Sequence, residues 1–125
     1  MTAHFPGRAP IDGYGAGGFS FAQMSHRGSI LALPSGIHAW GAADAKALTP
    51  DDFARVIAER GEIDLLLIGM GREMARPPRA VREALEAAGL MIDPMATGHA
   101  VATYNLLLGE KRRVAAALIA VDHGA

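Results

Sequence analysis

The chain has 125 residues, the length of one domain with a single core, and half of its residues are hydrophobic while 20% are charged. This composition indicates a packed globular protein. The net charge of -1 excludes an overall electrostatic attraction to nucleic acid or to an anionic membrane, and the absence of cysteine excludes disulfides, thiolate metal sites and cysteine nucleophiles.

Residues 1–10 contain prolines and a glycine but no apolar run that could form the core of a signal peptide. We expect a flexible N-terminal arm there, followed by one domain over residues 11–125. No window approaches the roughly 20 apolar residues that a membrane helix requires. The sequence therefore predicts a soluble protein that is not embedded in a membrane, and the lack of cysteine fits a cytoplasmic location.

The first part of the domain is predicted to contain three short strands. Four glycines lie among residues 11–18, but no helix follows them, so tight turns are expected rather than a phosphate-binding loop. Phe19 and Phe21 alternate with small residues in a strand pattern. Residues 29–33 form a second strand, which we expect to pair with the first as a hairpin, and residues 37–40 form a third extended segment.

A helix is predicted to begin at residues 49–52, where a threonine and a proline precede two aspartates that complement the helix dipole. It is expected to end near Gly61. The next segment, residues 63–71, consists almost entirely of large aliphatic residues up to its closing glycines. A strand of this composition must be covered on both faces, so we expect it at the centre of the molecule with helices packed on it.

A second helix is predicted after the prolines at residues 77–78, with its end at Gly89. Residues 90–92 then form a brief strand. A strand, a helix and a strand within this short distance predict a parallel crossover. The elements therefore indicate an α/β fold.

The last part of the chain is predicted to contain one helix and one strand. The helix begins with Thr97 as its N-cap and runs to about Leu108, where Gly109 ends it. Residues 114–121 are almost wholly apolar, with alanine at four of the eight positions. We predict a buried strand, and a helix is the alternative because alanine favours helices.

The sharpest candidate site is formed by Gly69, Met70 and Gly71, directly after the buried strand. Ligands of α/β sheets bind beyond the carboxyl ends of strands, where turn amides can hold an anion. A dinucleotide fingerprint is incomplete here, because residue 74 is methionine where glycine or alanine is needed. Two interpretations are left open: a plain tight turn, or a loop that binds a small anionic ligand with help from Arg72.

A second candidate set consists of Thr97, Tyr104 and Asn105 on the last helix. Asparagine is a poor helix former, and its amide needs a hydrogen bond partner in an apolar helix. One interpretation is that Asn105 binds the backbone of a neighbouring loop while Tyr104 packs at the edge of the core. The other is that these residues form a polar floor beneath the turn at residues 69–71, so that both motifs face one cleft.

No pattern in the chain indicates a catalytic constellation. There is no nucleophile elbow and no Walker loop. The five histidines lack metal-ligand spacing: His4, His26, His38, His99 and His123. We therefore predict no catalytic residue, no metal and no cofactor, and whether the protein is an enzyme is left open.

Several short segments follow one another in the order and spacing of a known family. They are residues 11–14, 18–19, 28–31, Trp40, 48–49, 66–71, 95–105 and 110–119. Together they resemble the Mth938-like domain family of unknown function, over residues 11–120. The sequence departs from the family pattern at Met70, where members often carry threonine, and at His99.

The resemblance implies a single compact domain in which a mixed β-sheet is flanked by about three helices, and it implies no known reaction. The mitochondrial branch of the family resembles an assembly factor of respiratory complex I. We therefore predict a non-enzymatic interaction domain with a protein partner or a homo-oligomer, no nucleic acid, and an exposed apolar patch around Trp40, Met70 and Met74. The alternative is a binder of a small anionic ligand, or an enzyme, with a cleft at the turn of residues 69–71.

Overall fold

The computed structural model describes residues 5–122, and the ends of the chain at residues 1–4 and 123–125 lie outside the description. Its strands form two sheets. The larger sheet has six strands in the order β1 (Phe5–Pro6), β6 (Gly36–Trp40), β5 (Ser29–Leu33), β9 (Val114–Leu118), β7 (Leu65–Gly69) and β8 (Met91–Met95). The smaller sheet has three strands in the order β2 (Gly13–Gly15), β3 (Gly18–Phe21) and β4 (Met24–Arg27).

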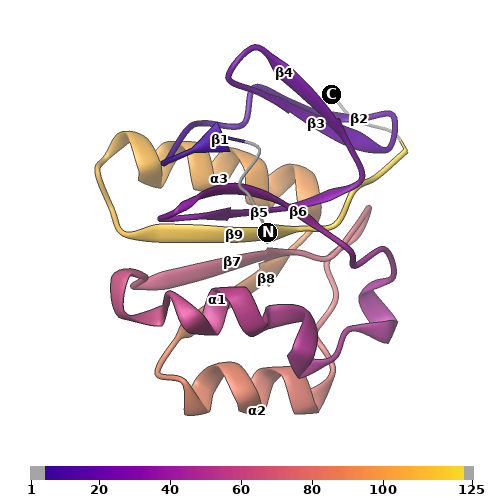
Figure 1. The fold of residues 1–125 in the computed structure, drawn as a ribbon. Coiled ribbons are helices and arrows are strands. Elements are labelled where there is room, and N and C mark those ends of the chain that lie inside the picture. Colours follow the sequence, from indigo (N-terminus) through magenta and orange to yellow (C-terminus); the bar gives the residue numbers. More distant parts are fainter. Residues whose placement is uncertain (1–4, 123–125) are drawn as a thin grey trace.

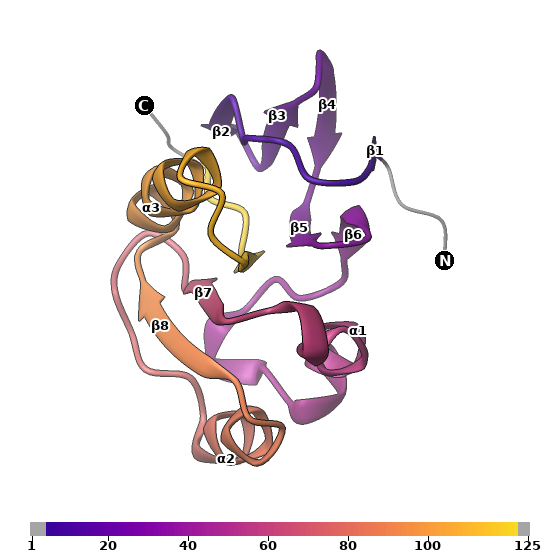
Figure 2. The same cartoon turned by 90° about the vertical axis from the view of Figure 1, so that its left-hand side faces the viewer.

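The helices cover the larger sheet on both faces. They are α1 (Ala54–Ala58), α2 (Arg79–Ala87) and α3 (Thr97–Gly109), with short 3-10 turns η1 (Ala45–Ala47), η2 (Pro50–Phe53) and η3 (Arg60–Glu62). Figures 1 and 2 show α1 and α2 on one face of the large sheet, and α3 with the small sheet on the other. The predicted α/β class with a mixed sheet and three helices is therefore confirmed.

The apolar strand predicted at the centre of the molecule is β7, and it is buried as expected. Leu66 and Ile68 point into the core beneath α1 and α2, while Leu67 points into the core beneath α3. Strand β7 pairs in parallel with β8, which confirms the predicted crossover, and it also pairs in parallel with β9. Its carboxyl end therefore lies at the same edge of the sheet as that of β9.

The alanine-rich segment near the C-terminus is the buried strand β9, so the helical alternative is excluded. It lies between β5, which is antiparallel to it, and β7, which is parallel. Ala115 and Ala117 face the α1 and α2 side, and Ala116 faces the α3 side. All three are completely buried.

The helix expected over residues 49–61 is divided into η2, α1 and η3. The indole N–H of Trp40 donates a hydrogen bond of 2.8 Å to the backbone carbonyl of Asp52, and the Trp40 and Phe53 rings meet edge to face at 5.4 Å. Because this carbonyl is engaged by Trp40 at the junction between η2 and α1, packing on the sheet accounts for the interruption.

The predicted hairpin between residues 19–21 and 29–33 is wrong. Strand β3 pairs instead with β4, which the sequence did not reveal, and β5 belongs to the large sheet. The turn between β3 and β4 consists of Ala22 and Gln23, both with positive φ, of 50° and 62°. Such turns normally contain glycine or asparagine, so this one gave no sequence signal.

A flexible arm is expected over residues 1–10, but residues 5–10, the part of it that the structure describes, are packed on the rest of the domain. Phe5 pairs with Ile37 in the sheet, the Gly7 N–H donates to the Ser35 carbonyl at 3.1 Å, and Ala9 is buried. Residues 5–9 thus belong to the domain. No helix within residues 5–122 is long and apolar enough to cross a membrane.

Candidate functional site at the carboxyl ends of strands β7 and β9

A cleft of about 940 Å³ opens at the edge of the large sheet where β7 and β9 end. This is the right-hand end of the sheet in Figure 1. The lining comes from several parts of the chain: Gly17, Gly28, Ser29, Trp40, and residues 41–46, 70–75 and 119–122. The cleft follows from the topology, since parallel neighbours deliver their closing loops to one edge.

The floor of the cleft is apolar and its rim carries one exposed methionine. Trp40, Met70 and Ile119 are 8%, 4% and 3% exposed, whereas Met74 is 63% exposed. The predicted apolar patch around Trp40, Met70 and Met74 is therefore mostly a buried wall, and only Met74 reaches solvent. The indole N–H of Trp40 is already bonded within the protein and is not available to a ligand.

The charges of the lining do not favour an anion. Lys46 and Arg72 are opposed by Asp44, Glu73 and Asp122, so the acidic side chains outnumber the basic ones. A basic pocket would be needed to attract a small anion by electrostatics alone.

The turn at residues 69–71 is closed by hydrogen bonds within the protein. The Met70 N–H donates to the Met95 carbonyl at 2.8 Å, and the Gly71 N–H donates to the Thr97 hydroxyl at 3.0 Å. Two amides that an anion would need are thus already used. Gly71 has a φ of 110°, which favours glycine, and a Cβ at Gly69 would come within 2.9 Å of the Thr97 hydroxyl.

Thr97 connects the two predicted motifs, but not as a helix cap. The N-cap of α3 is Ala96, and Thr97 is the first helical residue. Its fully buried hydroxyl donates to the Ile119 carbonyl at 2.7 Å while it accepts from Gly71. The Thr97 side chain therefore ties together the ends of β7, β9 and α3.

Asn105 binds backbone, which is the first of its two predicted interpretations. Its amide nitrogen donates to the Ile11 carbonyl and its amide oxygen accepts from the Ile11 N–H, each at 2.8 Å. Tyr104 is only 1% exposed, and this burial raises the pKa of its hydroxyl to about 12, while the positive charge of Arg8 acts in the opposite direction. Asn105 therefore attaches the N-terminal segment to α3, while Tyr104 belongs to the buried core cluster that also contains Ala9 and Ile11.

The two predicted motifs therefore do not line one cleft. Met70, Gly71 and Arg72 belong to the lining, but Gly69, Thr97, Tyr104 and Asn105 do not. A further wall, residues 41–46, was not predicted, because a loop that lies opposite a motif only in the folded chain gives no local signal.

A serine, a histidine and a glutamate come together elsewhere in the fold, which the sequence did not indicate. The Ser35 hydroxyl donates to the Glu59 carboxylate at 2.6 Å and contacts His38 Nε2 at 2.8 Å, and the Ser35 N–H donates to the same carboxylate at 2.9 Å. In a nucleophilic triad the acid orients the histidine. Here the carboxylate holds the serine, so the group anchors the turn between β5 and β6 to the end of α1.

The fold is that of a Mth938-like domain. A solution structure of a Mth938-like domain from Bordetella pertussis matches with a TM-score of 0.77 at 23% identity, over 98% of this chain and 93% of that one. A crystal structure described as an outer membrane protein from Bartonella henselae matches with a TM-score of 0.91 at 52% identity, over 94% of this chain and 99% of that one.

The chain belongs to the family described as "Protein of unknown function (DUF498/DUF598)", whose model matches residues 11–119. The family resemblance predicted from the sequence is thereby confirmed. An uncharacterized protein of Rhodobacter capsulatus is 46% identical over 115 residues, which cover 92% of this chain and 87% of that protein.

The chain is also similar to a mouse protein described as NADH dehydrogenase (ubiquinone) 1 alpha subcomplex assembly factor 3. The two are 27% identical over 119 residues, which cover 95% of this chain. The chain spans 64% of the length of the mouse protein.

Proposed function

We propose that this chain is a non-enzymatic domain that binds a protein partner, as an assembly factor does. The supporting observation is its similarity to assembly factor 3 over 95% of its length. The similarity spans the whole folded domain rather than one motif, so the interaction surfaces of the two proteins are built on the same scaffold. We also propose that the protein acts in the cytoplasm.

The cleft beyond β7 and β9 is the proposed contact surface. The exposed Met74 supplies a flexible apolar side chain that a partner can cover, and the buried wall of Trp40, Met70 and Ile119 behind it gives the cleft a rigid apolar floor. Burial of one exposed methionine contributes about 1.5–3 kcal/mol to association. A protein partner fits the mixed charges of the rim better than a small anion does.

Co-purification with a matched pair of methionine variants tests this proposal. Met74→Glu places a charge on the rim of the cleft, whereas Met91→Glu places the same charge at a methionine of similar exposure, 63% against 68%, on the edge strand β8. We expect the partner to be retained by the unmodified chain and by Met91→Glu, and to be lost from Met74→Glu.

If the partner is a second copy of this chain, light scattering on the same three proteins measures the molar mass of the oligomer. Only Met74→Glu should then have a lower molar mass. Equal thermal unfolding of the two variants is the control for folding. The proposal fails if both variants retain the same partner, or if no partner and no oligomer is found with the unmodified chain.

A second candidate function is the binding of a small anionic ligand, or an enzymatic reaction on one, in the same cleft. The location of the cleft at the carboxyl ends of two parallel strands favours it, although the lining as a whole carries more acidic than basic side chains. If it holds, phosphate or citrate should raise the unfolding temperature of the unmodified chain but not that of Arg72→Gln. An equal rise of the unfolding temperature in both proteins would rule out anion binding at Arg72.

A further inference from the structure

Strand β4 is an edge of the small sheet, and its outer side is open. Along β4, the backbone N–H and C=O groups of successive residues point alternately toward β3 and away from it. The tight turn at residues 22–23 and the hydrogen bond of 2.7 Å from the Gly28 N–H to the Gly17 carbonyl determine which residues point toward β3. Residues 24, 26 and 28 direct their backbone groups toward β3, so Ser25 and Arg27 direct theirs away from it. Within residues 5–122, no backbone hydrogen bond engages the outward N–H and C=O groups of Ser25 and Arg27.

Both edges of the large sheet are protected, whereas the edge formed by β4 is not. Both edge strands of the large sheet contain a proline, Pro6 in β1 and Pro94 in β8. Pro94 lies on the outer side of β8, because its neighbour Met95 accepts a bond from Met70 on the inner side. A proline there removes a donor that an added strand would need. Strand β4 contains no proline.

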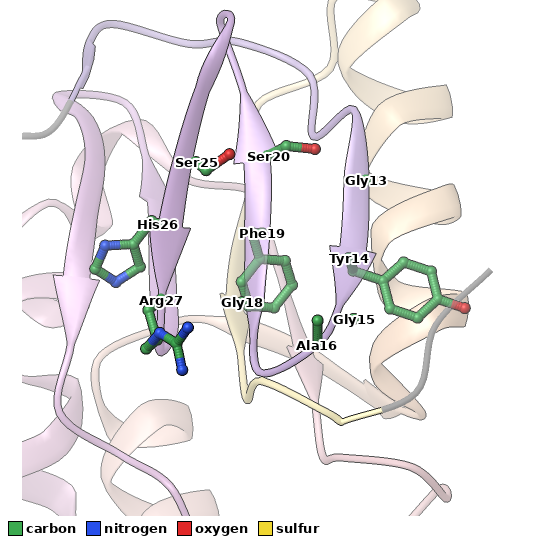
Figure 3. Close-up of a pocket in the computed structure, with 10 residues that line it drawn as sticks. All are labelled: Gly13, Tyr14, Gly15, Ala16, Gly18, Phe19, Ser20, Ser25, His26 and Arg27. Atoms are coloured by element: carbon green, nitrogen blue, oxygen red, sulfur yellow. The ribbon is translucent and has the colours of Figure 1, made fainter.

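A hollow of about 520 Å³ lies on the face of the small sheet next to this open edge (Figure 3). Residues directly opposite each other in the sheet share a face, and the residues on the hollow side are Gly13, Ser20 and Ser25 in one row, and Gly15, Gly18 and Arg27 in the next. Apart from Arg27 these are small. The hollow therefore leaves room for the side chains of a strand added beside β4.

Arg27 is the only charged residue in the three strands of the small sheet. Among the described residues its guanidinium group forms no ion pair. Figure 3 shows it at one end of the hollow, with the hydroxyls of Ser20 and Ser25 toward the other. A carboxylate is the group that complements an arginine with two parallel hydrogen bonds.

We propose that β4 binds an extended, acidic segment of a partner protein, which adds a fourth strand to the small sheet. The outward backbone groups of Ser25 and Arg27 supply the pairing, and Arg27 selects a carboxylate on the side of the added strand that faces the hollow. This surface is distinct from the proposed contact at Met74, so each can be tested without the other.

Amide chemical shifts with a pair of model peptides test the proposal. The probes are acetyl-Thr-Val-Glu-Val-Thr-amide and the same peptide with lysine in place of glutamate. We expect the acidic peptide to shift the amide signals of Ser25 and Arg27, and the basic peptide to bind about tenfold more weakly, since one charged hydrogen bond corresponds to roughly that factor. The Arg27→Glu variant should instead bind the basic peptide more tightly than the acidic one.

Two substitutions at one position separate backbone pairing from side-chain contact. Ser25→Pro removes an outward N–H without removing a bond inside the sheet, and it should abolish binding, whereas Ser25→Ala should bind normally. The proposal is overturned if neither peptide shifts these signals, or if Arg27→Glu keeps the original preference. It is also overturned if acetate alone reproduces the shifts, because the hollow would then be a site for small anions.

Discussion

Thr97 is the residue through which the ends of three elements are joined. Replacement by valine keeps the shape of the side chain but leaves the Gly71 N–H and the Ile119 carbonyl without their buried partner. An unpaired buried group costs about 1–3 kcal/mol, so Thr97→Val should lower the free energy of unfolding by about 2–4 kcal/mol in urea titrations.

Thr97→Ser is the matched control, because it keeps the hydroxyl and removes only a methyl group. Thr97→Ser should lower the free energy of unfolding by about 1 kcal/mol. If valine and serine destabilise the protein equally, the hydroxyl is not the source of the stability and the assignment of Thr97 is wrong.

Tyr104 should give the protein a dependence on alkaline pH. Burial raises its pKa from 10.0 to about 12, so the folded chain keeps a proton that the unfolded chain releases. The stability from this burial is fully present below about pH 10 and is lost as the pH rises through about 12. Between about pH 9 and about pH 11 the free energy of unfolding should fall by about 1 kcal/mol more than in Tyr104→Phe.

Urea unfolding of both proteins at the two pH values measures this difference. The variant lacks the ionisable hydroxyl but retains the ring, so the difference between the two proteins isolates the Tyr104 hydroxyl. Parallel pH profiles would show that Tyr104 does not titrate differently in the folded and unfolded states.

The residue scale also shows the limit of prediction from sequence. That Asn105 needs a partner follows from its place in an apolar helix. Its partner, Ile11, is 94 residues away, and only the folded chain shows the contact. The closed turn at residues 69–71 is similar, since its amides are engaged by Met95 and Thr97 from elements far along the chain.

At the scale of elements, the end of β7 is packed directly on the first turn of α3. A Cβ added at Gly69 would lie 2.9 Å from the Thr97 hydroxyl and 3.0 Å from the Leu118 side chain. Gly69→Ala should therefore force α3 away from the sheet and lower the free energy of unfolding by about 1–3 kcal/mol. Thermal unfolding measures the effect.

The control for this change is Gly109→Ala at the other end of the same helix. Nothing lies within 4 Å of a Cβ there, so alanine should be neutral or stabilising by up to about 1 kcal/mol through its helix propensity. Two alanines with the same effect would contradict the proposed close packing at Gly69.

Elements with a strong local pattern were predicted correctly and the others were not. The unbroken aliphatic run of β7 and the apolar segment of β9 indicate buried strands whatever surrounds them. Strand β4 has the sequence MSHR and follows a turn without glycine, so it has neither an apolar alternation nor a turn signal. The helix after residue 49 is interrupted by a contact with Trp40, which no local pattern contains.

At the scale of the whole molecule, the N-terminal segment is part of the fold. Removal of residues 1–10 would expose the edge of β6, open the space filled by Ala9 and remove the Arg8 side chain, which bonds to the Glu62 carbonyl at 3.4 Å. We expect the shortened chain to lose about 1–3 kcal/mol of unfolding free energy in urea. An unchanged unfolding midpoint would mean that the segment is dispensable.

The place of the cleft could be predicted, but its shape could not. The rule that ligands lie beyond the carboxyl ends of parallel strands led to residues 70–72, which do line the cleft. The opposite wall, residues 41–46, and the end wall, residues 119–122, come from segments whose proximity depends on the strand order. The acidic balance of the lining depends on them as well.

Strand β9 contributes side chains to two separate buried clusters, one on each face of the large sheet. Ala115 and Ala117 belong to the cluster that contains the cleft floor, whereas Ala116 belongs to the one that supports the small sheet. The cleft proposed as one contact surface and the small sheet proposed as the other therefore rest on side chains from opposite faces of β9. A substitution at Ala116 should alter the packing beneath the small sheet first, and one at Ala117 the packing beneath the cleft.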